Sequence, residues 1–109
     1  HQRGLSEKVL LVCCGEMGRT PKLQNNGGRN HWGRLAPLML AGGGLKMGQV
    51  IGRSTPDGGE PASEPITSEN LVATIMHTLL DVTAVRLRDD LPRDLHNLIT
   101  TTRPIRELV

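Results

Sequence analysis

A continuous apolar run from Val9 to Cys14 is the feature that most restricts how this chain can fold. The run contains β-branched residues and lies between Lys8 and Gly15, which is typical of a strand covered on both faces. Such strands occur mainly in parallel sheets, where helices lie against both sides. The run therefore predicts a strand at about residues 9–14 in an α/β fold.

The remaining elements are predicted from a second apolar run, from turn-forming residues and from helical periodicity. They are a loop at 21–34, a strand at about 35–41, a loop at 53–64, a helix at about 67–82 and a tail at 83–109. Within the loops, "NNGG" is a strong turn signal, and Asp57 in "PDGG" is a turn former. Thr67 or Ser68 can cap the helix. One further helical turn is expected at 95–99, before an extended "TTRPIREL" segment.

The composition allows only a modest hydrophobic core. In 109 residues, Phe and Tyr are absent and Trp32 is the single aromatic residue, so Leu, Val, Ile and Met must fill the interior. Thirteen Gly and seven Pro residues predict long loops. This balance suits a fragment that packs against a larger structure, and the "HQRG" start is consistent with a cut end. We therefore expect residues 1–109 to be one domain fragment that is incomplete on its own.

The charge pattern favours anions as ligands but not nucleic acid as a partner. The net charge is +2, and ten of the thirteen basic residues are Arg, whose planar fork makes bidentate contacts with oxyanions. No dense basic run interleaved with aromatic residues is present, which argues against nucleic acid. No apolar run approaches the roughly 18 residues of a membrane span.

The two cysteines, Cys13 and Cys14, are adjacent in the sequence. Neighbouring side chains on a strand point to opposite faces, so a disulfide between them would be strained. We expect two free, buried thiols.

Several blocks resemble the C-terminal part of an uncharacterised bacterial family of sulfatase-like proteins in the alkaline-phosphatase superfamily. The blocks are "GEMGRTPK", "NGGRNHW", "APLMLAGGGLKMGQVIG", "ITSENLVATIMHTLLDV" and "RPIRELV". The resemblance implies the C-terminal portion of an alkaline-phosphatase-like sheet with flanking helices. Many members of that family are exported, so it also implies a periplasmic or extracellular parent protein. In that superfamily one or two divalent metals lie at the edge of the sheet.

The candidate site residues follow from this resemblance. Glu16 comes where the first strand ends, a place similar to that of a metal-binding Asp in the superfamily. His31 precedes the next strand, where the superfamily has a metal-binding His or a substrate-binding Lys. The implied metal ligands are therefore Glu16 and His31, with zinc, manganese or calcium as the ion. Arg19 is the candidate catalytic residue, and Arg19, Arg29 and Lys46 are the candidate substrate contacts.

Each of these residues also has a simpler interpretation. Glu16 and Arg19 could form an ordinary surface ion pair. His31 could pack against Trp32 or bond to its own loop. The Gly-rich segment around Lys46 is explained by turn geometry alone.

One residue departs from the pattern of the family. Asn30 stands where the family usually has Asp, and an amide cannot replace the charge of a carboxylate. If that Asp orients the neighbouring His, the site in this chain is weakened.

Two functions remain open at this point. The first is a metal-dependent phosphate or sulfate ester hydrolase of unknown substrate, whose nucleophile and other ligands lie in an upstream part of the parent chain, so that this chain alone is inactive. The alternative is a non-catalytic binding or structural module that keeps the fold without the chemistry. The expected partners are the upstream part of the parent chain and a second copy, since exposed sheet edges tend to pair.

Overall fold

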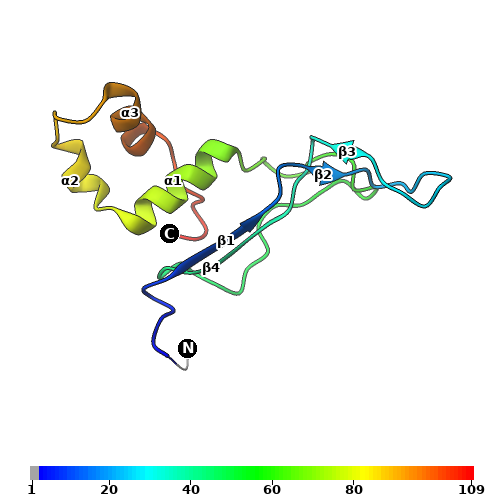
Figure 1. Cartoon of the computed structure of the whole chain (residues 1–109), viewed down its shortest axis with the longest axis horizontal. Helices are drawn as coiled ribbons and strands as arrows, with labels where there is room; N and C mark the ends of the chain where they lie inside the picture. The colour runs from blue at the N-terminus through cyan, green and yellow to red at the C-terminus, as the bar shows by residue number, and fades with distance from the viewer. Residues whose placement is uncertain (1–2) are drawn as a thin grey trace. The chain divides into compact units, whose positions relative to one another are not determined.

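The structure is a computed structural model that describes residues 3–109 and combines short strands with helices (Figure 1). The strands are β1 (Leu10–Cys14), β2 (Gly18–Arg19), β3 (His31–Trp32) and β4 (Leu38–Gly42), and the helices are α1 (Ser68–Leu79), α2 (Val82–Arg86) and α3 (Arg93–Thr101). The predicted mixture of α and β structure is confirmed. The strands form two separate two-stranded sheets, β1–β4 and β2–β3. Nothing in this arrangement confirms an alkaline-phosphatase-like fold.

β1 and β4 correspond to the two predicted strands but are not buried as predicted. The N–H of Gly43 donates to the carbonyl of Val9 at 2.9 Å, which places the end of β4 beside the start of β1 and makes the pair antiparallel. Leu11 in β1 is 52% exposed and Met39 in β4 is 53% exposed. The prediction of a strand covered on both faces is therefore wrong for residues 3–109. Such burial requires layers on both sides of a wider parallel sheet, and β1 pairs only with β4.

The two cysteines of β1 are exposed to solvent for the same reason. Cys13 and Cys14 are free, as predicted, but both are exposed rather than buried. Their place at the end of an uncovered strand accounts for the difference.

α1 is the helix that the periodic pattern predicts, and Thr67 caps it. The side-chain oxygen of Thr67 accepts from the N–H of Asn70, and the side-chain oxygen of Asn70 accepts from the N–H of Thr67 at 2.9 Å. This reciprocal pair satisfies two backbone donors at the start of the helix. The helix ends at Leu79 instead of residue 82, because Leu80 is extended and Asp81 caps the next helix.

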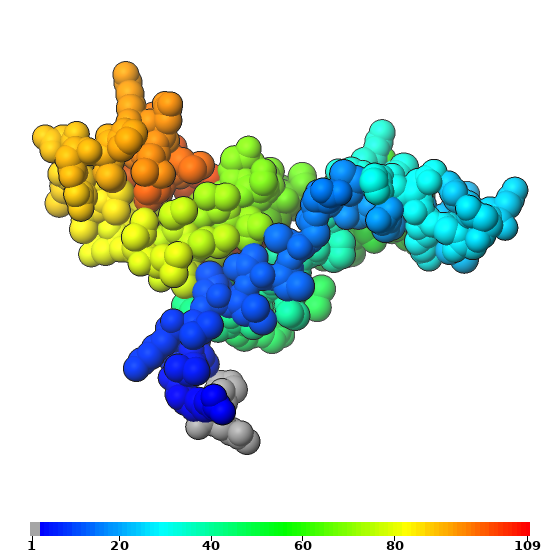
Figure 2. Space-filling model, viewed as in Figure 1, coloured from blue at the N-terminus to red at the C-terminus, as the bar shows by residue number. Residues whose placement is uncertain are grey.

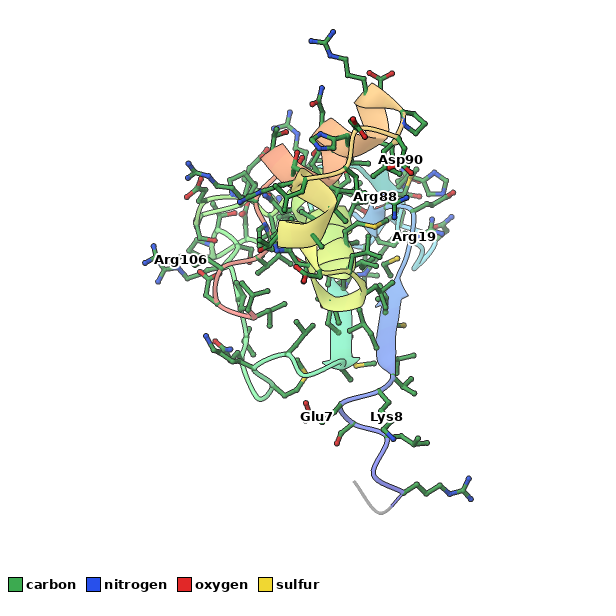
Figure 3. All side chains as sticks on the ribbon, turned by 90° about the vertical axis from the view of Figure 1, so that its left-hand side faces the viewer. Glu7, Lys8, Arg19, Arg88, Asp90 and Arg106 are labelled. Carbon is green, nitrogen blue, oxygen red and sulfur yellow. The ribbon has the colours of Figure 1, made fainter. Side chains whose placement is uncertain are left out.

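Residues 82–101 are more helical than the sequence indicates. α2 begins after Asp81, whose Oδ1 accepts from the N–H groups of Thr83 and Ala84 at 3.0 and 3.1 Å. α3 extends the single predicted turn at 95–99 to nine residues. In the connection between the two helices, the Arg88 Nε donates to Asp90 at 2.8 Å, and the two side chains lie together in Figure 3. This exposed pair lowers the pKa of Asp90 through the hydrogen bond from Arg88.

The chain divides into two compact units. The first unit consists of the described residues up to Leu10, of Ala41–Gln49 and of Ile66–Val109. The second consists of Leu11–Leu40 and Val50–Pro65. The first unit contains all three helices, and the second contains the β2–β3 sheet.

The core of the first unit lies between the helices and the C-terminal segment. Its buried apolar residues are Ala73, Val82, Ile99, Ile105 and Leu108. Thr74 is completely buried among them, and its hydroxyl donates to the carbonyl of Asn70 at 2.7 Å. The same oxygen accepts from the N–H of Ile105 at 2.8 Å. One hydroxyl therefore joins α1 to the C-terminal segment.

We expect Thr74→Val to lower the free energy of unfolding of the first unit by about 2 kcal/mol, because a buried N–H of Ile105 loses its acceptor. Thr78→Val is the matched control, since the Thr78 hydroxyl bonds only within α1, to the carbonyl of Thr74 at 2.8 Å. Urea unfolding followed by circular dichroism at the helix band measures the difference. Equal midpoints for the two variants would contradict this role of Thr74.

The part of the chain that the structure describes contains no helix that is both long and apolar enough to cross a membrane.

Candidate anion-binding site

β2 and β3 form the two arms of a hairpin whose centre is the "NNGG" turn. The arms are antiparallel, with Gly18 opposite Trp32 and Arg19 opposite His31. Beyond β2 and β3, the N–H of Thr20 donates to the carbonyl of Asn30 at 2.9 Å, which extends the pairing toward the turn. Opposite residues of an antiparallel pair project on the same face, so the side chains of Arg19 and His31 are neighbours.

The turn itself is fixed by side-chain and backbone hydrogen bonds. The side-chain oxygen of Asn26 accepts from the N–H of Gly28 at 2.9 Å, and the N–H of Gln24 donates to the carbonyl of Gly28 at 2.8 Å. Gly27 has a φ of 77°, which a residue without a side chain adopts at no steric cost. The turn predicted from these residues is confirmed. Figure 2 shows the loop between β2 and β3 projecting from the rest of its own unit.

Arg29 lies on the arm that leads into β3, and its side chain bonds to the other arm of the hairpin. Its Nη1 donates to the carbonyls of Thr20 and Pro21 at 2.8 and 2.6 Å. These bonds hold the guanidinium group against the arm that contains Arg19. Two Arg side chains are thereby brought to one side of the hairpin.

The hairpin residues line an open hollow of about 340 Å³. Its lining consists of Arg19, Arg29, Asn30 and His31, and it includes no carboxylate. Two guanidinium groups, an imidazole and an amide can all donate hydrogen bonds. Such a set fits an oxyanion, with Arg19 offering a bidentate fork.

The 53–63 loop packs against the hairpin within the same unit. The indole N–H of Trp32 donates to the carbonyl of Gly59 at 2.7 Å, and the guanidinium of Arg34 lies 5.8 Å from the centre of the Trp32 ring. Arg34 also forms an ion pair with Glu60. These contacts tie β3, and with it His31, to the loop.

Asp57 organises the loop, as its turn-forming sequence predicts. Its Oδ1 accepts from the hydroxyl of Thr55 at 2.6 Å and from the N–H of Gly59 at 3.1 Å. The Thr55 bond, then the Gly59 bond, and finally the charge of Lys22 lower the pKa of Asp57. The carboxylate is therefore charged at neutral pH, near the cationic hairpin.

The structure brings together three of the five residues expected from the sequence. Arg19, Arg29 and His31 line one hollow. Glu16 is exposed and is not part of its lining, and it forms no ion pair with Arg19. Asn30 lines the hollow as well, although the sequence indicates it only as a replacement for the Asp that the family usually has.

The fifth residue, Lys46, lies in the first unit and contacts the end of the chain. Its N–H donates to the carbonyl of Leu108 at 2.9 Å, and its Nζ donates to the carbonyl of Val109 at 2.5 Å. Gln49 adds a bond to the carbonyl of Glu107 at 2.9 Å. In this structure Lys46 holds the C-terminal segment, and its substrate role stays a prediction.

A metal site is not completed by the described residues alone. Among residues 3–109 there is no group of three or more His, Cys, Asp or Glu side chains placed to hold a metal ion. A metal bound through Glu16 and His31 would therefore need ligands from beyond these residues.

The fold and the hollow define a chain of mixed α and β structure with a cationic pocket on a hairpin. The chain belongs to the family described as "Protein of unknown function (DUF1501)", which its sequence matches over residues 1–107. No curated protein and no solved structure matches it significantly. The resemblance to an uncharacterised family is thus confirmed, whereas sulfatase-like ancestry and export stay predictions.

Proposed function

We propose that the hollow formed by Arg19, Arg29, Asn30 and His31 binds the phosphate or sulfate group of a ligand. The observation that carries this proposal is the lining itself, which gathers two guanidinium groups and an imidazole without a carboxylate. Donors that are already in place bind an anion at a lower entropic cost, and the hairpin pairing and the Arg29 bonds hold these donors there.

Arg19 is the principal contact in this proposal. Arg29 uses Nη1 for the two carbonyls of its own hairpin, so part of its donor capacity is occupied. Arg19 is exposed and forms no ion pair in the described part of the chain, and its whole fork is free for a ligand. A bidentate contact from Arg to an oxyanion is stronger than a neutral hydrogen bond.

The resemblance to sulfatase-like proteins suggests a reaction at this site in addition to binding. We propose that the exported parent protein hydrolyses a phosphate or sulfate ester with the help of a divalent metal, and that Glu16 and His31 supply two of its ligands. A bound metal would stabilise the negative charge that develops on the ester oxygens. The anion contacts come from this chain, while the nucleophile is expected elsewhere in the parent, so the 109-residue chain is inactive alone.

A non-catalytic binding module is the second candidate, and Asn30 favours it. The family that the chain resembles usually has an Asp at this position. The amide of Asn30, which lines the hollow, cannot act as a base. The metal content of the purified parent protein, which contains the remaining expected ligands, separates the two candidates. Stoichiometric metal that is lost in His31→Ala supports the hydrolase, whereas no metal in either protein supports the binding module.

We expect Arg19→Ala to weaken the binding of inorganic phosphate and sulfate by at least about tenfold, because a charge-assisted bidentate contact is lost. Trp32 is the only aromatic residue and follows His31 directly, so its fluorescence reports binding at the hollow. Titration of the 109-residue chain with each anion gives the dissociation constants.

Arg53→Ala is the matched control for this titration. Arg53 is an exposed Arg of the same unit that does not line the hollow. Its removal changes the net charge by the same amount and should alter the affinity less than threefold, roughly the effect of a screened surface charge. Equal losses in the two variants, or no binding by the unaltered protein, would reject the proposed site.

A further inference from the structure

β1 has a row of backbone groups on the edge that faces away from β4. In the described part of the chain, β1 pairs only with β4. The bond from the N–H of Gly43 to the carbonyl of Val9 shows that Val9, and every second residue after it, turns its backbone groups toward β4. The N–H and C=O groups of Leu10, Val12 and Cys14 therefore point to the opposite edge. A row of such groups is a template for a further strand.

The sequence of β1 contains none of the usual protections of an edge strand. Proteins commonly protect such an edge with a charged residue or a proline, and "LLVCC" contains neither. On one face of the strand, Val9 is 53% exposed, Leu11 is 52% exposed and Cys13 is exposed as well. A two-stranded sheet is only marginally stable in water, whereas additional strands with an apolar face stabilise it.

The charges on either side of β1 indicate which strand fits this edge. The nearest charged residues are Lys8 before the strand, visible in Figure 3, and Glu16 after it, each four positions from Val12. Both are exposed, and neither forms an ion pair within the described residues. If two copies of β1 pair antiparallel about Val12, Lys8 of each copy lies opposite Glu16 of the other. β4 has no such pattern, because its nearest charged residues, Arg34 and Lys46, are both basic.

We propose that β1 is a self-association surface, on which a second copy of this chain pairs antiparallel about a two-fold axis at Val12. In this register Leu10 of one copy pairs with Cys14 of the other, and Val12 pairs with its own equivalent. Every outward-pointing N–H and C=O group of the strand thereby gains a partner. The product is a four-stranded sheet with β4 at both edges and the two copies of β1 at its centre.

The side chains agree with this arrangement. A two-fold interface has to be complementary to itself, and the Lys8 and Glu16 pattern meets that condition twice. On the exposed face, Leu11 of one copy lies opposite Cys13 of the other, so the apolar side chains of β1 cover one another. No charged residue lies opposite a like charge.

The test is sedimentation equilibrium of the 109-residue chain from about 10 µM to 1 mM, the range of a weak to moderate dimer. A reductant is present so that the exposed cysteines do not cross-link. The unaltered protein should show a monomer–dimer equilibrium. Lys8→Glu should weaken the dimer about tenfold at low ionic strength, because two attractive pairs become repulsive. Lys22→Glu is the matched control, an exposed Lys outside β1 with the same change of charge, and should alter the affinity less than about threefold.

The double variant Lys8→Glu, Glu16→Lys exchanges the two charges and should restore the affinity to within about threefold of that of the unaltered protein. A mixture of the two single variants should form a heterodimer in preference to either homodimer, since only the mixed pair has opposite charges at both ends. Neither position lies in a strand or helix, so the elements remain intact. A monomer at every concentration, assemblies larger than a dimer, or equal affinities for Lys8→Glu and the unaltered protein would each overturn the proposal.

Discussion

Gly18→Ala should lower the free energy of unfolding of the second unit by about 3 kcal/mol. Gly18 is buried at the start of β2, and a Cβ there would lie 1.8 Å from the carbonyl oxygen of Leu35 and 3.2 Å from that of Trp32. Both neighbours are backbone atoms, so no side-chain rotation can relieve the overlap. Either β2 or the segment around Leu35 has to move.

Gly33→Ala is the matched control for this change. Gly33 lies in the same unit, directly after β3, and a Cβ there would meet nothing within 4 Å. Denaturant unfolding followed by the fluorescence of Trp32 measures both variants. Indistinguishable midpoints would show that the close approach of Gly18 to Leu35 contributes no stability.

The same substitution should also disturb the hollow. Arg19 follows Gly18 directly and pairs with His31, so a shift of β2 separates the two contacts of the proposed anion site. A weaker phosphate affinity in Gly18→Ala, measured under conditions where the variant is still folded, is therefore expected. Gly33→Ala should bind phosphate like the unaltered protein.

The sequence predicts the elements whose cause is local. The periodicity and the cap of α1, the "NNGG" turn and the Asx turn at Asp57 each depend on residues a few positions apart, and all are found. The end of α1 was missed because Asp81 serves as the cap of α2, which interrupts an apolar pattern that continues past it.

The burial of β1 depends on more distant residues and could not be read from its own sequence. An apolar run indicates a strand, but its cover is determined by the elements that pack on it. Leu11 and Met39 are exposed here because the described sheet has only two strands. The close approach at Gly18 is similar, since its partner Leu35 is distant in the sequence.

For the site, the residues were predicted better than their arrangement. The "NNGG" turn lies between Arg19 and His31, so an antiparallel hairpin closed by this turn would have placed the two residues on facing arms. The loop predicted at residues 21–34 does not indicate this pairing. The contacts of Gly59 and Glu60 with Trp32 and Arg34 come from a different segment, which no local pattern connects to the hairpin.

Gly42→Ala should destabilise the first unit by about 4 kcal/mol, because two costs add. Gly42 has a φ of 81°, a left-handed conformation that costs a residue with a side chain about 1–2 kcal/mol. A Cβ there would also lie 2.2 Å from the carbonyl oxygen of Val9 and 3.0 Å from that of Ser6. The first of these carbonyls accepts the N–H of Gly43, so the clash also strains the bond that joins β4 to β1.

Gly48→Ala separates the two costs. Gly48 belongs to the same unit and has nearly the same φ, 79°, but a Cβ there would meet nothing within 4 Å. It should therefore show only the conformational cost, about 1–2 kcal/mol. Thermal unfolding followed by circular dichroism reports on α1, α2 and α3, which lie in that unit. If both variants lose the same stability, the backbone conformation alone explains the glycine at position 42, and the close approach to Val9 is not a constraint on the fold.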